Sequence, residues 1–519
     1  MELMRTNVRM MRREKEAVSQ VTFDEDYNVP DSRPDVGRII QYKGKVLVEE
    51  VKASEARVLI TGSLNFQVLY VEDAGEGRIC SLDGKVPIEE SMNLDGIESG
   101  DKICLKWDME DLNLHLIHSR KLNVRALVTF EAAKEQAEEV GITTDLKCEG
   151  VSLKKKKLPI LGLHVHNRDT MRIREDFNLA SNKPDIHEIL WDTVDVRGMD
   201  VRAEEGKAVV KGELFVFVLY QDSNGSDTLE WLEYSLPFQK EIMCENCTQD
   251  MVPDMDLTLL SSTLSVKPDA DGEERVIQAD IVLEMDLKMY REELLELLQD
   301  IYHPGKEYVS AATPQILRQL LVKNYAKCRV NDRISLENRS GKILQVCHSD
   351  GEVRVDDSRV VENGVAVDGI VQVKILYITG DDDMPFYSAE AAVPFSQVIE
   401  APGIGADCIW NLHTDLEQLS TAMVDGNEIE IKALVNLNVL VLRETNEPII
   451  DSVEERELNM EKLKMMPGIV GYVVKQGDTL WDIAKRFYTS VEVIKAVNNL
   501  TSDEIHPKDT LILVKNVER

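Results

Sequence analysis

Two cysteines, Cys244 and Cys247, have the spacing of a redox motif or of half a zinc site. Tetrahedral zinc needs four ligands, and no second pair lies near this one in the sequence. His164 and His166 would share one face of a strand and could chelate a metal, but no third ligand accompanies them. We therefore expect the cysteines to be dispensable, with no part in metal or redox chemistry, and the histidines to be surface residues or to have ordinary hydrogen-bond partners. The sequence predicts no metal site, no cofactor and no catalytic residue.

Four contiguous lysines at 154–157 could bind an anionic surface, because they oppose the acidic character of the rest of the chain. The simpler interpretation, which we adopt, is a solvated linker between domains. The sequence contains no Walker loop, no GxSxG elbow and no HExxH helix. A phosphate cradle or an activated nucleophile is therefore not recognisable, and we expect a protein that is not an enzyme.

The chain has 519 residues, which predicts several domains, and 94 acidic against 60 basic side chains give a formal net charge of -34. Such a surface repels polyphosphates, which disfavours general nucleic-acid binding. We find neither an export signal nor an apolar segment of membrane-spanning length. Eight cysteines are too few for a disulfide scaffold, so we expect reduced thiols and an intracellular location.

One pattern occurs three times, in segments 60–70, 210–220 and 367–377. Each segment has a glycine eight residues before a tyrosine, and a proline follows the tyrosine after seventeen residues. The three sets are Gly62, Tyr70 and Pro87; Gly212, Tyr220 and Pro237; and Gly369, Tyr377 and Pro394. Fixed intervals of this kind predict three copies of one fold.

Apolar and polar residues alternate in each segment, which predicts a strand with one buried face. In the first copy the inward face holds Ile60, Leu64, Phe66, Val68 and Tyr70. The glycine shares this face, where a strand glycine usually marks a bulge or a close backbone approach. We expect the tyrosine to be a core or corner piece rather than a ligand contact.

The fold class predicted is mainly β: three tandem β-sandwich-like repeats followed by a small α+β module with the order strand, helix, helix, strand. Helical periodicity appears mainly between the second and third repeats, where two short helices separated by a His-Pro-Gly break would form a connector. The expected boundaries are an N-terminal extension 1–23, repeats at 24–135, 172–290 and 327–446, a helical connector 291–326, a linker 447–470 and the final module 471–516.

In the final module, strands are expected near residues 472–474 and 511–514, with two helices between them. Thr489 and Glu492 have capping-box spacing for the second helix, which should stop near Asn498. The segments YVVKQGDTLWDIAKRF, VEVIKAVNNL and IHPKDTLILV make this region resemble a LysM domain over 471–514. Lys508 stands where that family usually has glycine, so we expect its last turn to differ.

The resemblance implies a groove for N-acetylglucosamine-containing glycans, lined by the loop after the first strand and the loop before the last. Its residues here are Gly477, Asp478, Thr479, Leu480, Asn498, Leu500 and Ile505, and Trp481 lies beside them. We expect Trp481 either to anchor a partner or to pack on the linker, and we predict a protein-binding surface centred on Leu480, Trp481 and Ile505.

The three upstream copies resemble the SPOCS domains of spore-forming Firmicutes, through Lys183-Pro184-Asp185, Ile189, Gly212 and Leu219-Tyr220. Three such domains and one LysM domain is the arrangement of spore morphogenetic proteins. The resemblance implies a mother-cell protein of the cytoplasm that lies at the forespore surface. It also implies a partner, the basement-layer ATPase of the spore coat, stage IV sporulation protein A.

Three hypotheses for function remain. The first is an adaptor in spore coat assembly that acts by protein-protein interaction through its LysM domain. The second is a cell-wall protein that binds peptidoglycan or another N-acetylglucosamine glycan, and the third is a cysteine-based metal or redox protein. From residue 471 onward seven basic and seven acidic residues balance, so the negative charge lies in residues 1–470. A neutral module can approach an acidic partner without the repulsion that the repeats would impose, which favours the adaptor.

Overall fold

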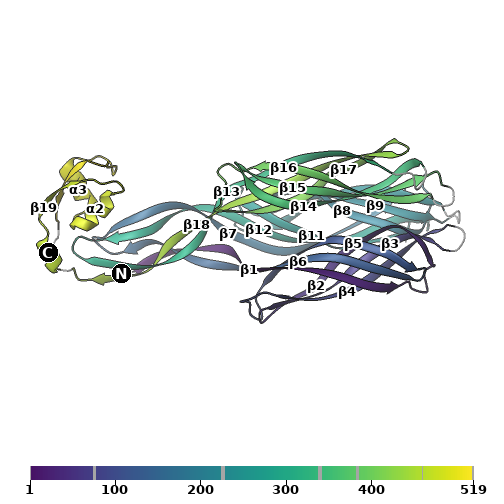
Figure 1. Ribbon diagram of the computed structural model, residues 1–519, viewed down its shortest axis with the longest axis horizontal. Helices are drawn as coiled ribbons and strands as arrows, with labels where there is room; N and C mark the ends of the chain where they lie inside the picture. The colour runs from purple at the N-terminus through teal and green to yellow at the C-terminus, as the bar shows by residue number, and fades with distance from the viewer. Residues whose placement is uncertain are drawn as a thin grey trace.

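The computed structural model describes residues 2–73, 77–223, 228–336, 342–381, 385–458 and 460–516, and within them the side chain of Lys462 is not described. Three lobes of strands form a head at one end of an elongated molecule, and a small helical module lies at the other end, near both chain termini (Figure 1). The mainly β fold with a small α+β module is confirmed.

In the residues that the structure describes, eighteen strands build the three repeats, six in each. Repeat 1 holds β1 (Glu2–Asn28), β2 (Val36–Ser54), β3 (Arg57–Glu72), β4 (Ile79–Asn93), β5 (Ile103–His118) and β6 (Lys121–Lys147). Repeat 2 holds β7 (Ser152–Asn178), β8 (Ile186–Glu204), β9 (Lys207–Asp222), β10 (Leu229–Met243), β11 (Val252–Pro268) and β12 (Glu274–Tyr302). Repeat 3 holds β13 (Glu307–Ser335), β14 (Ile343–Val361), β15 (Gly364–Thr379), β16 (Phe386–Glu400), β17 (Cys408–Asp425) and β18 (Glu428–Arg456).

Each repeat is a sandwich of two antiparallel three-stranded sheets. In repeat 1 the sheets have the orders β2-β3-β4 and β1-β6-β5, and repeats 2 and 3 follow the same plan. The inward face expected from the sequence is buried: Ile60, Leu64, Val68 and Tyr70 have no exposed surface, and Phe66 is almost fully buried. Alternation with a period of two places these side chains between the sheets, where burial of apolar surface stabilises the fold.

The repeated glycine, tyrosine and proline have structural roles. A Cβ atom on Gly62 or Gly369 would lie 2.2 Å from a backbone oxygen of the neighbouring strand, and the strand pairing slips beside both glycines. The hydroxyls of Tyr70 and Tyr220 donate to the carbonyls of Pro34 and Pro184, at 3.1 and 3.2 Å. The prolines lie in β4, β10 and β16, which are edge strands and tolerate a missing N–H.

Near the end of each central strand, the face that points away from the sandwich core is also buried, which the sequence did not predict. Side chains from all three repeats meet there in one further core. Its buried members are Ile40, Leu69, Val71, Ile79, Leu190, Trp191, Phe217, Leu219, Cys347, Leu376 and Phe386. Three copies of one fold thus pack around a shared centre.

A stalk extends from this head toward the helical module (Figure 1). It consists of three two-stranded ribbons: residues 2–14 pair with 134–147, residues 152–163 with 290–302, and residues 307–320 with 442–456. The ribbons bury a common apolar core that includes Val8, Ile160, Leu297, Leu317 and Ile449. The segment 1–23, expected as an extension, is therefore part of β1 where the structure describes it.

The helical connector expected at 291–326 is wrong, because β12 and β13 run through it. Adjacent pairs such as Leu297 and Leu298 resembled a helical stripe, but both are fully buried in a strand whose pairing shifts between Leu298 and Asp300. Leu297 packs in the stalk core with Leu317, and Leu298 packs in a second stalk cluster with Ile450, so consecutive residues are both buried and imitate helical periodicity. Pairing with β7 and β18 outweighs local helix propensity here.

The lysine run is likewise no linker, since it lies in β7 within the stalk. Lys155 pairs with Asp145 at 3.0 Å and Lys156 pairs with Glu447 at 2.6 Å. Lys157 lies 3.7 Å from Glu296. Three of the four lysines thus have acidic partners, two on neighbouring ribbons and one on the same ribbon.

After the helix α1 (Met460–Met465), the final module follows the expected order: β19 (Ile469–Val473), α2 (Leu480–Phe487), α3 (Val491–Asn498) and β20 (Thr510–Val514). Its core contains Leu480, Ile483, Ile494, Leu511 and Leu513. The expected capping residue is off by one, because the hydroxyl of Ser490 accepts from the N–H of Val493 and Thr489 is buried. Helix α3 ends at Asn498 as expected, where Asn499 takes a left-handed conformation.

Candidate functional site

The LysM groove residues divide into exposed and structural positions. Gly477 and Thr479 are exposed in the loop before α2, and the hydroxyl of Thr479 caps that helix by accepting from Asp482 N–H at 3.2 Å. Asp478 closes its own turn, because its carboxylate accepts from the hydroxyl of Tyr472 at 2.6 Å and from the N–H of Lys475 at 2.8 Å. Leu480 is a core residue with 2% exposure. Its side chain therefore belongs to the core, and Gly477 and Thr479 form one rim.

The opposite rim comes from the segment between α3 and β20. Leu500 and Ile505 are half-buried and pack against the module core. Asn498 is committed to the fold, because its amide N–H groups donate to Ile494 O and Ile512 O, and its amide oxygen accepts from Ile512 N–H. These contacts cover the polar backbone edge of β20.

Lys508 adopts the conformation that glycine favours, with φ of 81°. Its N–H donates to Val474 O at 2.8 Å, so the turn beside the groove has the left-handed form even though lysine replaces glycine. A lysine in this left-handed conformation carries a cost in backbone strain. The expectation that this last turn differs from the form usual in the family stays a prediction.

Trp481 packs on the stalk rather than on the linker. Its indole N–H donates to Asp300 at 2.8 Å, and Lys485, one turn further along α2, pairs with the same carboxylate at 2.7 Å. Burial raises the pKa of Asp300, but the hydrogen bonds from Lys485 and Trp481 outweigh it, so this pKa is lowered. Tyr302 completes the contact, since it is 7% exposed and joins the core of the module.

Sequence reasoning missed Asp300 and Tyr302 because the segment was taken for a helix. A strand assignment for β12 would have placed both residues on one face at its end. Nothing in the sequence indicated that this end contacts the final module.

The two cysteines of the CxxC segment are bonded as a disulfide, so the expectation of reduced thiols is wrong for this pair. They are buried in the core of repeat 2. The matching turn of repeat 1 places Leu94 and Ile97 in the same way, and the backbone contacts agree: Leu94 bonds to Ala56 as Cys244 bonds to Gly206. The cysteines thus occupy the positions of an apolar pair that closes the sandwich.

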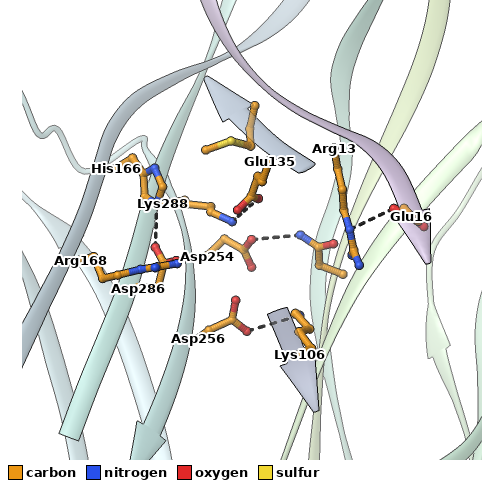
Figure 2. A network of polar contacts seen from close by, with 12 residues as sticks. Arg13, Glu16, Lys106, Glu135, His166, Arg168, Asp254, Asp256, Asp286 and Lys288 are labelled. Carbon is orange, nitrogen blue, oxygen red and sulfur yellow. Dashed lines mark hydrogen bonds and ion pairs between the residues drawn. The ribbon is translucent and has the colours of Figure 1, made fainter. Parts of the chain in front are cut away.

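A polar network lies where stalk and head meet (Figure 2). His166 and Arg168 both contact Asp286 at 2.8 Å, and these contacts hold the pKa of that carboxyl below its ordinary value although burial opposes the shift. The other histidine, His164, lies 3.6 Å from Glu293. Both histidines therefore have an acidic partner.

The same network ties the repeats together. Lys288 of repeat 2 reaches Glu135 of repeat 1 at 2.7 Å, and both side chains are largely buried. Asp254 of repeat 2 accepts from Asn411 at 3.0 Å and contacts His413 of repeat 3 at 2.7 Å. Burial lowers the pKa of His413, but its contacts with Asp254 outweigh this and raise it above its ordinary value.

A cavity of about 540 Å³ opens between repeats 2 and 3 beside this network. Asp254 and His413 on its wall bind each other, and Lys323 donates to Pro253 O at 2.5 Å. Asp254, His413 and Lys323 thus make contacts that join repeat 2 to repeat 3. Among the residues that the structure describes, no cluster of three or more potential metal ligands was found.

The strand sandwiches and the terminal module define a class: tandem β-repeat proteins that end in a LysM domain. The SPOCS domain of SipL matches residues 35–117, 185–267 and 342–424, and the LysM domain matches residues 472–514. The chain belongs to the SipL-like family, with three SPOCS domains and a C-terminal LysM domain, and is a sporulation protein with a module of the cell-wall-binding type.

One curated relative shares a short stretch with the chain. N-acetylmuramoyl-L-alanine amidase sle1 of Staphylococcus saprophyticus is 50% identical over 40 residues, which are 8% of this chain. The chain covers 12% of the length of that amidase. In the part of the chain that the structure describes, no helix has the length and apolar character needed to cross a membrane.

Proposed function

We propose that the protein is a non-enzymatic adaptor in spore coat assembly, and that its LysM domain attaches to the basement-layer ATPase, stage IV sporulation protein A. The observation that carries the proposal is the placement of the LysM domain at the end of a stalk, away from the head (Figure 1). A partner can contact the module there without contacting the head, which favours a role in which the stalk presents the module to a partner.

The residues whose side chains could take part in chemistry have structural contacts, which supports a non-enzymatic role. Cys244 and Cys247 fill a core position, and His166 is paired with Asp286. The groove side chains of Asp478 and Asn498 are engaged in the module's own turns and strand edge. The remaining groove surface around Ile505 suits apolar contact with a protein. We place the protein in the cytoplasm of the mother cell, at the forespore surface.

The adaptor proposal is tested with the purified chain and the ATPase. We expect Ile505→Lys to weaken binding about tenfold or more, because a charge replaces a half-buried apolar rim residue, a loss above ~1.4 kcal/mol. Ala496→Lys is the matched control, since Ala496 is exposed on α3 and the same charge is added there. Equal binding by both variants would contradict a role for the groove.

A second candidate function is binding of peptidoglycan or another N-acetylglucosamine glycan, which the LysM match favours. The same two variants distinguish it when titrated with soluble peptidoglycan fragments. If the wild-type chain binds these fragments and not the ATPase, the cell-wall function replaces the adaptor.

A further inference from the structure

The contact between the LysM domain and the stalk has the geometry of a recognition site. Trp481 and Lys485 lie four residues apart on α2, so their side chains project from one face of the helix. Both direct a polar hydrogen at Asp300: the indole N–H at 2.8 Å and the ammonium at 2.7 and 2.9 Å from the two carboxylate oxygens. Two convergent donors of this kind select a carboxylate over a neutral group.

The stalk offers more than a carboxylate. Tyr302 follows Asp300 on the same face of β12, and its ring centroid lies 6.3 Å from that of Trp481 in an edge-to-face arrangement at 73°. Ile301 between them is buried with the stalk residues Leu298 and Ile450. The module therefore contacts an extended strand at two alternate positions, one acidic and one aromatic.

The module has a core of its own beneath this face. Ile483, Ile494, Leu511 and Leu513 are almost fully buried within residues 474–513, and Tyr302 is the residue of that core cluster that comes from outside the module. Helix α1 and the segments on either side of it join the module to β18. The stalk tip thus covers one face of a separately built domain.

We propose that the Trp481 and Lys485 face of α2 is a recognition site for an acidic side chain followed two residues later by an aromatic one on an extended protein strand. Asp300-Ile301-Tyr302 at the stalk tip occupies this site as an internal ligand. An external protein that presents the same pattern competes with the tip and releases the module. This deepens the proposed function, because it states the chemistry that a partner strand needs.

The ionisation of Asp300 is consistent with its role as an internal ligand. The lowered pKa of Asp300 keeps its carboxylate charged at neutral pH, so the internal ligand is in the form that Lys485 attracts. The tip and the module belong to one chain, so their contact is intramolecular and the tip has an effective concentration that a free strand lacks. An external strand must therefore bind well or be abundant to displace it.

The test uses the full chain and a fluorescent peptide of residues 297–304, LLQDIYHP, as the probe. The chain variant D300N/Y302A loses the internal ligand, so we expect it to bind the peptide at least about tenfold more tightly than the wild type does. A peptide carrying D300N should bind that variant about tenfold more weakly than the parent peptide, because its charge-assisted contacts are lost.

Two further variants separate recognition from misfolding. D300N alone retains the Tyr302 ring and should give an intermediate affinity for the peptide. K485M in the D300N/Y302A background should abolish the difference between the two peptides, with the melting transition of the chain retained. If the wild type and D300N/Y302A bind the peptide equally, or if neither binds it, or if both peptides bind alike, the proposal is wrong. The ATPase is absent, so this failure is distinct from a failure of the adaptor.

Discussion

At the junctions between repeats, contact with a charged group of another repeat shifts the pKa of a side chain. Asp195 of β8 lies beside Asp350 of β14, so two carboxyl groups from different repeats share one partly buried place, and Arg197 bonds to Asp195 at 3.0 Å. Burial, and then the charge of Asp350, raise the pKa of Asp195 from its ordinary value of 3.8 to about 7. A carboxyl group of this kind prefers to keep its proton in the folded state.

This shift predicts that Asp195 contributes stability at low pH that is lost as the pH rises from about 4 to about 7. In that window Asp195 binds more proton in the folded than in the unfolded state, so its contribution to the free energy of unfolding falls with pH and levels off above about 7. D195N removes the titrating group, and its melting temperature relative to wild type should therefore increase across the same window. Asp271→Asn, at an exposed turn, is the control and should show no such trend. A constant difference between D195N and wild type would contradict the shift.

At the scale of the element, each repeat has a shift in strand pairing beside the repeated glycine of its central strand. Gly369 of β15 faces a place where the partner strand comes so near that a Cβ atom would lie 2.2 Å from Arg354 O and 2.9 Å from the ring of Phe395. The backbone oxygen cannot swing away as a flexible side chain can. The glycine is therefore required by close approach.

We expect Gly369→Ala to destabilise the chain by about 1–3 kcal/mol, because the methyl group overpacks the junction of β14 and β15. Gly380→Ala is the matched control in the same repeat, since no atom lies within 4 Å of the added Cβ atom there. Denaturant unfolding of both variants measures the effect. Equal midpoints for the two would show that the strand moves to admit the methyl group.

At the scale of the whole molecule, three covalently linked repeats behave as one assembly. The central core contains Leu69, Leu219 and Leu376, one from each repeat at matching positions of the central strand. The stalk core and the polar network at its base add two further sets of contacts between repeats. We therefore regard the head and stalk as one folding unit rather than three.

The pair formed by Lys288 and Glu135 tests this coupling of repeats 1 and 2. K288M should cost about 3–5 kcal/mol of unfolding free energy, because it leaves Glu135 largely buried without its cation. The double variant K288M/E135L should recover most of that loss, since it removes both charges from the same place. Denaturant titration followed by fluorescence gives both values. A double variant no more stable than K288M would mean that the pair is not the cause.

The sequence alone determined the number of repeats, the inward face of their central strands and the order of elements in the LysM module. Those features are local, because alternation with a period of two, turn residues and cap residues specify them within a few positions. The groove residues followed from the resemblance by position, and Leu480 and Asn498 among them proved to have structural contacts.

Only the tertiary structure decided the rest. Leu297 and Leu298 belong to a bulged strand of the stalk rather than a helix, because pairing with distant strands outweighs local propensity. Leu219 lies on the strand face that points away from the sandwich core, and its burial depends on contacts with the other repeats. Trp481 meets Asp300 across 181 positions of chain, a pairing that no local pattern encodes. Contacts between repeats depend on three-dimensional packing, and they form the stalk, the shared core and the docking of the LysM domain.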